Sequence, residues 1–144
     1  MAIRRLTLRD CELAQPLIEA QYREHGIAMG GPRLAGALRT LVRGKGLVLL
    51  STERVTPVGT AVLSWNYELE RGGAVAWLDE LYVVPERRGK GIGRALLRHA
   101  LREARREGCE SVQLEVVRGH DRAARLYVRE GFARLPRTRY MRVL

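Results

Sequence analysis

Residues 83–94 read VVPERRGKGIGR, and the three glycines in this stretch restrict the folds that the chain can adopt. Two valines end an apolar run, a proline interrupts it, and the following ALLRHALREA has the periodicity of an amphipathic helix. A glycine-rich loop that enters a helix exposes backbone N–H groups at the positive end of the helix dipole, where phosphate groups bind. The sequence therefore predicts a phosphate-binding loop in an α/β fold, with a solvated basic turn as the alternative.

The spacing of these glycines excludes the two commonest phosphate-binding loops. A Walker A loop requires G-x-x-x-x-G-K-[ST], which the sequence lacks. The dinucleotide fingerprint G-x-G-x-x-G needs a third glycine where Arg94 stands, and no clear acidic partner for a ribose follows at the required distance. The pattern that remains is Arg88-x-x-Gly91-x-Gly93.

Hydrophobic periodicity and turn residues predict eleven elements in one domain, residues 1–144. The predicted order is strand, two helices, three strands, helix, strand, helix and two strands. The strands are expected at 3–9, 46–53, 58–68, 74–84, 111–117, 132–136 and 138–144, and the helices at 10–22, 34–42, 91–107 and 121–130. The fold class is therefore mixed α/β, with the helix at 91–107 as a crossover between two parallel strands.

The chain is strongly basic, with a formal net charge of +10 from 26 basic and 16 acidic residues. Such a charge attracts polyanions in general, but here the arginines are spread along the chain and no helix shows a contiguous basic face. We therefore expect no nucleic-acid partner. No apolar run is long enough to span a membrane, so a cytoplasmic protein is expected. Cys11 and Cys109 lack metal-type spacing, and no metal is expected.

Two blocks of sequence resemble the GNAT superfamily of N-acetyltransferases. The first is Arg88-x-x-Gly91-x-Gly93 preceded by LYVVPE, which is similar to the family's coenzyme A loop. The second is RAARLYVREGF at 122–132, which resembles the late A-x-x-L-Y-x-x-x-G-F helix of the family. The resemblance implies a central, mostly antiparallel twisted sheet of six to seven strands with about four helices. It extends over the whole chain and is sharpest at 78–132.

The resemblance also implies acetyl-CoA as cosubstrate, with its diphosphate on the backbone from Gly89 to Arg94. The matching position for a backbone N–H that polarises the thioester carbonyl is Val83, and Tyr127 matches a tyrosine that donates a proton to the leaving thiolate. A packing role for Tyr127 is compatible with this one. The residues expected to bind the cofactor are Leu81, Tyr82, Val83, Arg88, Gly89, Lys90, Gly91, Ile92, Gly93, Arg94, His120 and Tyr127.

Asp79 and Glu80 are two acids inside an otherwise apolar strand, where carboxylates are unexpected unless they face water or a site. Strand alternation predicts that their side chains lie on opposite faces of the sheet. The pair resembles the adjacent acids of spermidine/spermine-type N-acetyltransferases, which favours Asp79 as the base and Glu80 as its support. Two solvated acids that balance nearby arginines are the alternative.

The acceptor side is expected to include aromatic residues, because aromatic rings beside carboxylates suit an ammonium group. The residues expected there are Tyr22, Trp65, Asn66 and Tyr67, together with Asp79 and Glu80. His120 stands where the family usually has asparagine, and it either contacts the pantetheine arm or only begins a helix.

The sequence thus favours an acetyl-CoA-dependent N-acetyltransferase acting on a primary amine. The acceptor is a small molecule, such as a polyamine or another cationic amine, or a protein. A regulatory acetyl-CoA-binding module is the first alternative, but it would not need Asp79, Glu80 and Tyr127. A basic nucleic-acid-binding protein is the less favoured one. Whether the protein forms a homodimer is left open.

Overall fold

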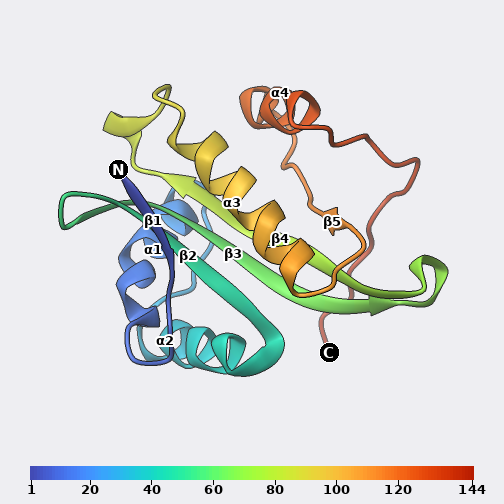
Figure 1. The fold of residues 1–144 in the computed structure, drawn as a ribbon, viewed down its shortest axis with the longest axis horizontal. Helices are drawn as coiled ribbons and strands as arrows, with labels where there is room; N and C mark the ends of the chain where they lie inside the picture. Colours follow the sequence, from blue (N-terminus) through green and yellow to red (C-terminus); the bar gives the residue numbers. More distant parts are fainter.

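Five strands and four α-helices are formed in the computed structural model, which describes residues 1–144 (Figure 1). The strands are β1 (Ala2–Arg5), β2 (Gly46–Glu53), β3 (Thr56–Glu68), β4 (Gly73–Val83) and β5 (Val112–Gln113). The helices are α1 (Gln15–Glu24), α2 (Gly31–Thr40), α3 (Ile92–Arg106) and α4 (Asp121–Arg129). Short helical turns lie at Cys11–Ala14, Leu41–Lys45, Leu69–Arg71 and Pro85–Arg87. The predicted order of elements is confirmed as far as α4.

The strands form one sheet in the order β1-β2-β3-β4-β5. The first three pairings are antiparallel, and β4 pairs with β5 in parallel. Parallel neighbours need a crossover connection, and α3 provides it, as the sequence predicts. The parallel ladder is short, since β5 pairs only at Ala76–Val112 and Trp77–Gln113. Most of the second half of β4 therefore has an unpaired edge on the β5 side.

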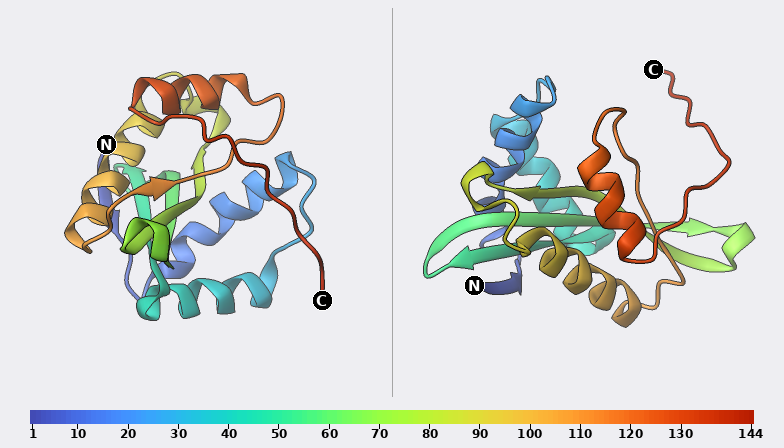
Figure 2. Two further views of the ribbon diagram at one scale, coloured as in Figure 1. Left: turned by 90° about the vertical axis from the view of Figure 1, so that its right-hand side faces the viewer. Right: turned by 90° about the horizontal axis from the view of Figure 1, so that it is seen from above.

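The sheet separates two apolar cores (Figure 2). On one face α3 packs against the sheet through its buried apolar side chains, among them Leu96, Leu97 and Ala100. On the other face lie α1 and α2, which contribute Leu17, Ile18, Leu34 and Leu38. Each helix has an apolar stripe that must be buried against the sheet, so the two-sided arrangement follows from the sequence pattern.

Gly59 allows the start of α3 to lie directly on the sheet. A Cβ atom at this position would be 2.9 Å from Leu96 Cδ1 and 3.0 Å from the carbonyl oxygen of Tyr82. Because these distances are shorter than a packed carbon allows, only glycine fits without movement of the helix or of β4. The close approach fixes the loop between β4 and α3 relative to the strands.

A β-bulge interrupts β4 at Asp79. Leu78 pairs with Leu63 and Glu80 pairs with the next residue of β3, Val62, so Asp79 has no partner in the register. Before the bulge, Ala76 and Leu78 face α3, and after it Leu81 and Val83 face the same core. One extra residue thus reverses the phase of side-chain alternation within a single strand.

The two strands expected at 132–136 and 138–144 are not formed, so the prediction of six to seven strands is corrected to five. The segment after α4 has no regular secondary structure and crosses the β3–β4 hairpin, where Arg137 forms a bidentate ion pair with Glu70 at 2.6 and 3.0 Å (Figure 2). Arg139 pairs with Glu115 and lies over the ring of Trp77, 5.0 Å from its centroid. Charged contacts, rather than a backbone ladder, hold this tail.

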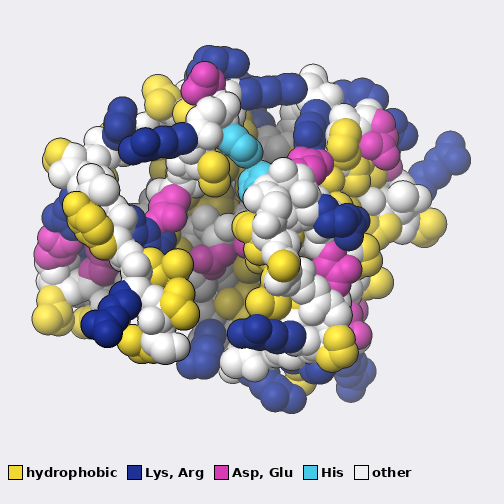
Figure 3. All heavy atoms as spheres, turned by 180° about the vertical axis from the view of Figure 1, so that it is seen from behind, with side chains coloured by type: hydrophobic (Ala, Val, Ile, Leu, Met, Phe, Trp, Pro, Cys, Tyr) yellow, Lys and Arg dark blue, Asp and Glu magenta, His cyan; other side chains and the backbone are white.

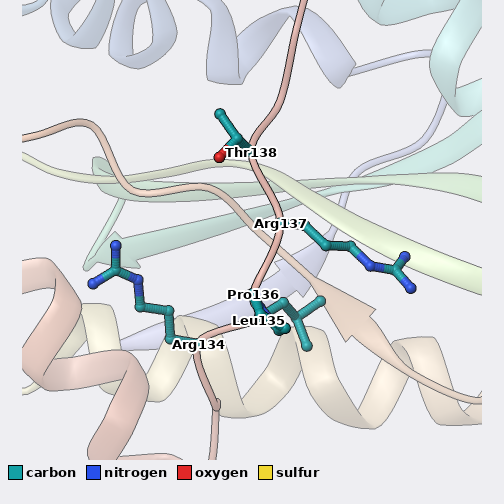
Figure 4. Close-up of a pocket in the computed structure, with 5 residues that line it drawn as sticks. All are labelled: Arg134, Leu135, Pro136, Arg137 and Thr138. Atoms are coloured by element: carbon teal, nitrogen blue, oxygen red, sulfur yellow. The ribbon is translucent and has the colours of Figure 1, made fainter.

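Five consecutive residues of the tail, Arg134–Thr138, line a shallow pocket (Figure 4). The side chains of Arg134 and Arg137 point to opposite sides of the chain there, and no residue of the glycine loop or of the acidic pair takes part. We therefore do not assign this pocket to the site described below. None of the helices has the length and apolar character needed to cross a membrane.

Candidate functional site

The glycine loop has the backbone conformation that its sequence predicts. Gly89 and Gly91 have φ angles of +76° and +83°, in the left-handed region that side chains rarely adopt. Gly91 is the N-cap of α3, and a Cβ atom there would meet nothing within 4 Å. The protein itself thus requires glycine at position 91 only for its backbone angle, and the space beside it is open.

The N-terminus of α3 has free backbone N–H groups that can bind an anion. No side chain caps it, and its first turn contains no acidic residue. The first N–H groups of a helix have no intrahelical partner, and here they stay available together with the positive end of the dipole. Ile92 is buried and anchors the turn, whereas Lys90 and Arg94 are exposed. These features fit a diphosphate on the backbone from Gly89 to Arg94.

Val83 has its backbone N–H directed toward the unpaired edge of β4. The next amide, Val84, donates to the carbonyl of Val58 in β3 at 3.0 Å. Successive N–H groups of a strand point to opposite edges, so the Val83 N–H points away from β3 and toward the side where β5 has diverged. Leu81 and Val83 are half-buried against the α3 core, and Tyr82 is buried on the α1 side.

The bulge brings the two acids of β4 to the same face of the sheet. The hydroxyl of Tyr22, on α1, donates to Glu80 Oε1 at 2.6 Å. Asp79 hydrogen-bonds Ser64, and its charge acts on both Glu80 and Tyr22. The prediction that alternation would place the two side chains on opposite faces is therefore wrong, because Asp79 is the extra residue at which the alternation is interrupted.

Glu80 is a carboxylic acid that titrates close to neutral pH. Burial raises its pKa from the ordinary 4.5 to about 7, with the hydrogen bond from Tyr22 lowering it and the negative charge of Asp79 raising it. Burial and the contact with Glu80 also raise the pKa of the Tyr22 hydroxyl, which therefore stays protonated and keeps donating. A group with a pKa near 7 can accept a proton at neutral pH far better than an ordinary carboxylate.

Asp79 differs from its neighbour. Desolvation raises its pKa, but the hydrogen bond with Ser64 and the positive charge of Arg139 oppose this effect. Asp79 is the more open of the two side chains. Environments that separate the pKa values of adjacent carboxylates assign them different roles. The pKa of both carboxyl groups is raised, but only that of Glu80 reaches about 7, which differs from the order that the resemblance suggests.

Tyr127 lies on α4, half-buried against the α3 core. Its ring packs edge-on against Phe132, with the centroids 5.7 Å apart. Burial raises the pKa of its hydroxyl, so the group is protonated at neutral pH. The packing role and the proton-donor role expected for this residue are compatible in this position, since the ring is fixed by the core.

The start of α4 contacts both the end of α1 and the glycine loop. The rings of His25 and His120 meet edge to face with their centroids 4.8 Å apart. Arg122 Nη2 lies 3.2 Å from the place that a Cβ of Gly89 would occupy. Arg122 is a candidate diphosphate ligand that the sequence did not indicate. It lies far from the loop along the chain, and only the fold brings it close.

Figure 3 shows a hollow on the face opposite to that of Figure 1, with acidic side chains inside it and histidine side chains at its rim. Tyr22 and Glu80 share this side of the sheet with α1. The structure does not bring Trp65 and Tyr67 to them, because Trp65 packs against the α3 core on the other face and Tyr67 is 69% exposed on the β3–β4 hairpin. The neighbouring Asn66 is also exposed. Trp77, which the sequence did not indicate as a site residue, lies beneath Arg139 of the segment after α4.

The model of the acetyltransferase (GNAT) family matches residues 14–132, which include the loop, the acidic pair and α4. The chain belongs to the GNAT family. This family uses acetyl-CoA as cosubstrate, and the residues of the loop fit that group, since they leave open space at Gly91 and an uncapped helix N-terminus.

Similarity to individual GNAT proteins is concentrated in part of the chain. Streptothricin acetyltransferase of Streptomyces lavendulae is 40% identical over 70 residues, which are 49% of this chain and 33% of that protein. Aminoalkylphosphonate N-acetyltransferase of Salmonella typhimurium is 36% identical over 75 residues, 52% of this chain and 49% of that protein. The chain thus matches less than half the length of either relative.

A solved structure from Arthrobacter sp. FB24 matches the whole GNAT fold. It is 34% identical, covers 100% of this chain and 96% of that chain, and gives a TM-score of 0.85. The arrangement of the sheet and helices described above is therefore that of the family.

Proposed function

We propose that the protein transfers the acetyl group of acetyl-CoA to a primary amine, and that this amine is cationic before it reacts. The observation that carries the proposal is Glu80, a half-buried carboxyl group that lies on β4 three residues before Val83 and whose pKa is raised to about 7. The glycine loop follows the end of the same strand. The loop supplies a place for the diphosphate, and the acid supplies a proton acceptor near the end of the same strand. Both relatives described above are acetyltransferases by name.

Each step of the transfer has a candidate group in the chain. Bound acetyl-CoA supplies an acetyl group on a thioester. Glu80 accepts a proton from the acceptor ammonium, whose ordinary pKa is about 10.4, and so frees the nitrogen to form the amide bond. The Val83 N–H donates to the carbonyl oxygen as negative charge develops on it. Tyr127 donates its proton to the sulfur when the carbon–sulfur bond breaks, and the second proton that the nitrogen loses as the amide forms restores the Tyr127 hydroxyl.

A cationic acceptor agrees with the charges at this end of the sheet. Asp79 and Glu80 place two carboxyl groups on one face, beside the ring and hydroxyl of Tyr22. The formal net charge of +10 repels cations at long range, but charges more than about 10 Å away are largely screened at ordinary salt. The local carboxylates therefore determine which acceptors are attracted.

The test is release of free coenzyme A from acetyl-CoA in the presence of polyamines, amino acids, aminoglycosides and lysine-containing peptides, over a range of pH. We expect turnover with at least one primary amine and none with alcohols of matched size. Acetylation of anionic or neutral acceptors alone would contradict the cationic acceptor. Tight acetyl-CoA binding with no turnover on any amine would instead indicate a regulatory module.

Tyr127→Phe is expected to lower kcat by about 10- to 100-fold while the Kd for coenzyme A changes little. The hydroxyl acts only as negative charge develops on the sulfur, so its loss affects the transition state and not the bound ground state. The ring contact with Phe132 is retained in this variant. The measurement is single-turnover kinetics together with calorimetric titration of coenzyme A.

Tyr140→Phe provides the matched control, because Tyr140 lies on the tail and is 91% exposed. It removes the same hydroxyl without touching α4, and its kinetics should equal those of the wild type. An unchanged rate of the chemical step in Tyr127→Phe would leave Tyr127 as a packing residue.

A further inference from the structure

Arg88 makes every hydrogen bond of its guanidinium group with α1 or with β4. Its Nη2 atom lies 2.8 and 2.9 Å from the two carboxylate oxygens of Glu24, the last residue of α1. Its Nε atom donates to the carbonyl oxygen of Val83 at 2.9 Å. Its Cζ atom lies 5.3 Å from the ring centroid of Tyr82. The side chain therefore connects the end of one helix with the end of one strand.

Glu24 contacts both Tyr82, which precedes Val83, and Arg88, which bonds the carbonyl of Val83. Besides Arg88, it accepts a hydrogen bond from the hydroxyl of Tyr82 at 3.1 Å. Tyr82 precedes Val83 in the chain, and Arg88 is bonded to the carbonyl that follows the Val83 Cα atom. Glu24 thus holds the side chain that precedes Val83, and Arg88 holds the carbonyl of Val83 itself, so together they restrict the direction of the Val83 N–H group.

These contacts differ from those of a phosphate ligand. An arginine that binds a diphosphate by its side chain offers its N–H groups to the phosphate oxygens, whereas here Nη2 is occupied by a carboxylate and Nε by the carbonyl of Val83. The neighbouring Arg87 is a useful contrast, because it also pairs with a glutamate, Glu53, at 2.7 Å, but has no hydrogen bond to β4. Both arginines are exposed to a similar degree.

We infer that the Glu24–Arg88 pair positions Val83 for the acetyl-transfer step and contributes little to the affinity for coenzyme A. The inference rests on the proposed function, because the Val83 N–H is the group taken to polarise the thioester carbonyl. Glu24 and Arg88 are positioning residues and touch no reacting atom. They also connect α1, which carries Tyr22, with the strand that carries Glu80.

The experiment compares Glu24→Gln, Arg88→Gln and Arg88→Lys with the wild type, using the best amine acceptor at saturating acetyl-CoA. We expect kcat to fall about tenfold in each variant, since a small misplacement of a catalytic group has effects of this order or larger. The Kd for coenzyme A should stay within about twofold. Arg88→Lys is decisive, because it keeps the charge that a phosphate needs but loses the fork that bridges Glu24 and Val83.

Two further variants distinguish a change in the position of Val83 from the general effect of losing a surface ion pair. Arg87→Gln breaks a comparable surface ion pair and should leave kcat and coenzyme A affinity unchanged. The double variant of Glu24→Gln and Arg88→Gln should lose no more than the more affected single variant, because the two side chains act as one unit.

Amide hydrogen exchange gives a readout that does not depend on activity. The Val84 N–H, bonded to Val58, should exchange faster in Glu24→Gln and Arg88→Gln than in the wild type or in Arg87→Gln. If no amine is acetylated by the wild type, the proposed function fails, and this exchange still tests the bridge. Unchanged exchange at Val84, or a Kd for coenzyme A raised tenfold or more with kcat unchanged, would overturn the inference.

Discussion

Gly91→Val is expected to abolish binding of coenzyme A while the protein stays folded. At φ = +83° a β-branched residue is strongly disfavoured, and the loop must either keep a strained backbone or rotate its N–H groups away. A Cβ atom at Gly91 meets no protein atom within 4 Å, so the valine side chain starts in open space and projects into the region proposed for the diphosphate. Calorimetric titration should show a Kd at least about 100-fold higher, which corresponds to about 2.7 kcal/mol.

Gly72→Val separates loss of binding from loss of stability. Gly72 lies in the β3–β4 turn, has φ = +77°, and like Gly91 would place its Cβ atom in open space. Strain of about 1–3 kcal/mol is expected in both variants, so each should lose several degrees in Tm. Only Gly91→Val should lose coenzyme A. Normal binding in Gly91→Val would show that the loop is not the diphosphate site.

Glu80→Gln is expected to lower kcat/KM for the amine acceptor about 100-fold and to remove the rise of activity with pH near neutrality. A base must be ionised to act, and burial raises the pKa of Glu80 to about 7. Wild-type kcat/KM should therefore increase as pH rises through about 7 and then level off. Glutamine keeps the shape and accepts the hydrogen bond of Tyr22, so the fold is retained.

The raised pKa of Glu80 also makes the free energy of unfolding depend on pH. Between the ordinary pKa of 4.5 and about 7, folded Glu80 keeps a proton that the unfolded chain has released. Its contribution to the free energy of unfolding therefore decreases as pH rises through that interval. Urea unfolding should show that Glu80→Gln gains stability relative to the wild type between pH 5 and pH 8.

Asp79→Asn is the comparison that distinguishes the two carboxylates. The negative charge of Asp79 raises the pKa of Glu80, so removing it should shift the rise in activity to lower pH without abolishing it. Tyr22→Phe should shift the rise to higher pH, because the hydrogen bond from Tyr22 lowers the pKa of Glu80. If the pH-dependent rise disappears in Asp79→Asn and persists in Glu80→Gln, Asp79 is the base.

Features set by neighbouring residues in the chain could be predicted from the sequence. The glycine spacing after the VVP turn predicted a strand-to-helix loop, and the left-handed angles of Gly89 and Gly91 and the free start of α3 agree with it. The broad apolar stripe of residues 91–107 predicted a buried crossover helix, which α3 confirms. In these cases the local pattern and the tertiary fold impose the same conformation.

Features that depend on partners far along the chain could not be predicted in the same way. The alternation of residues 138–144 fits a strand, but a strand forms only beside a free edge of matching length, and β5 pairs over two residues only. No glycine or proline lies beside Asp79, so the local sequence does not indicate the bulge. The Glu24–Arg88 pair joins residues 64 positions apart, and nothing in either local sequence indicates the contact.

The bulge in β4 also determines which sequence changes this region could tolerate. Removing the extra residue would restore regular alternation and leave Leu81 and Val83 facing α3 and Tyr82 facing α1, because the side-chain phases before and after the bulge differ by one residue. Such a regular strand would keep only one of the two carboxylates on the α1 face, since neighbouring residues of a regular strand point to opposite faces. The bulge thus lets two consecutive acids face α1 without moving Val83, and a homologue that is one residue shorter here should present a single acid on this face.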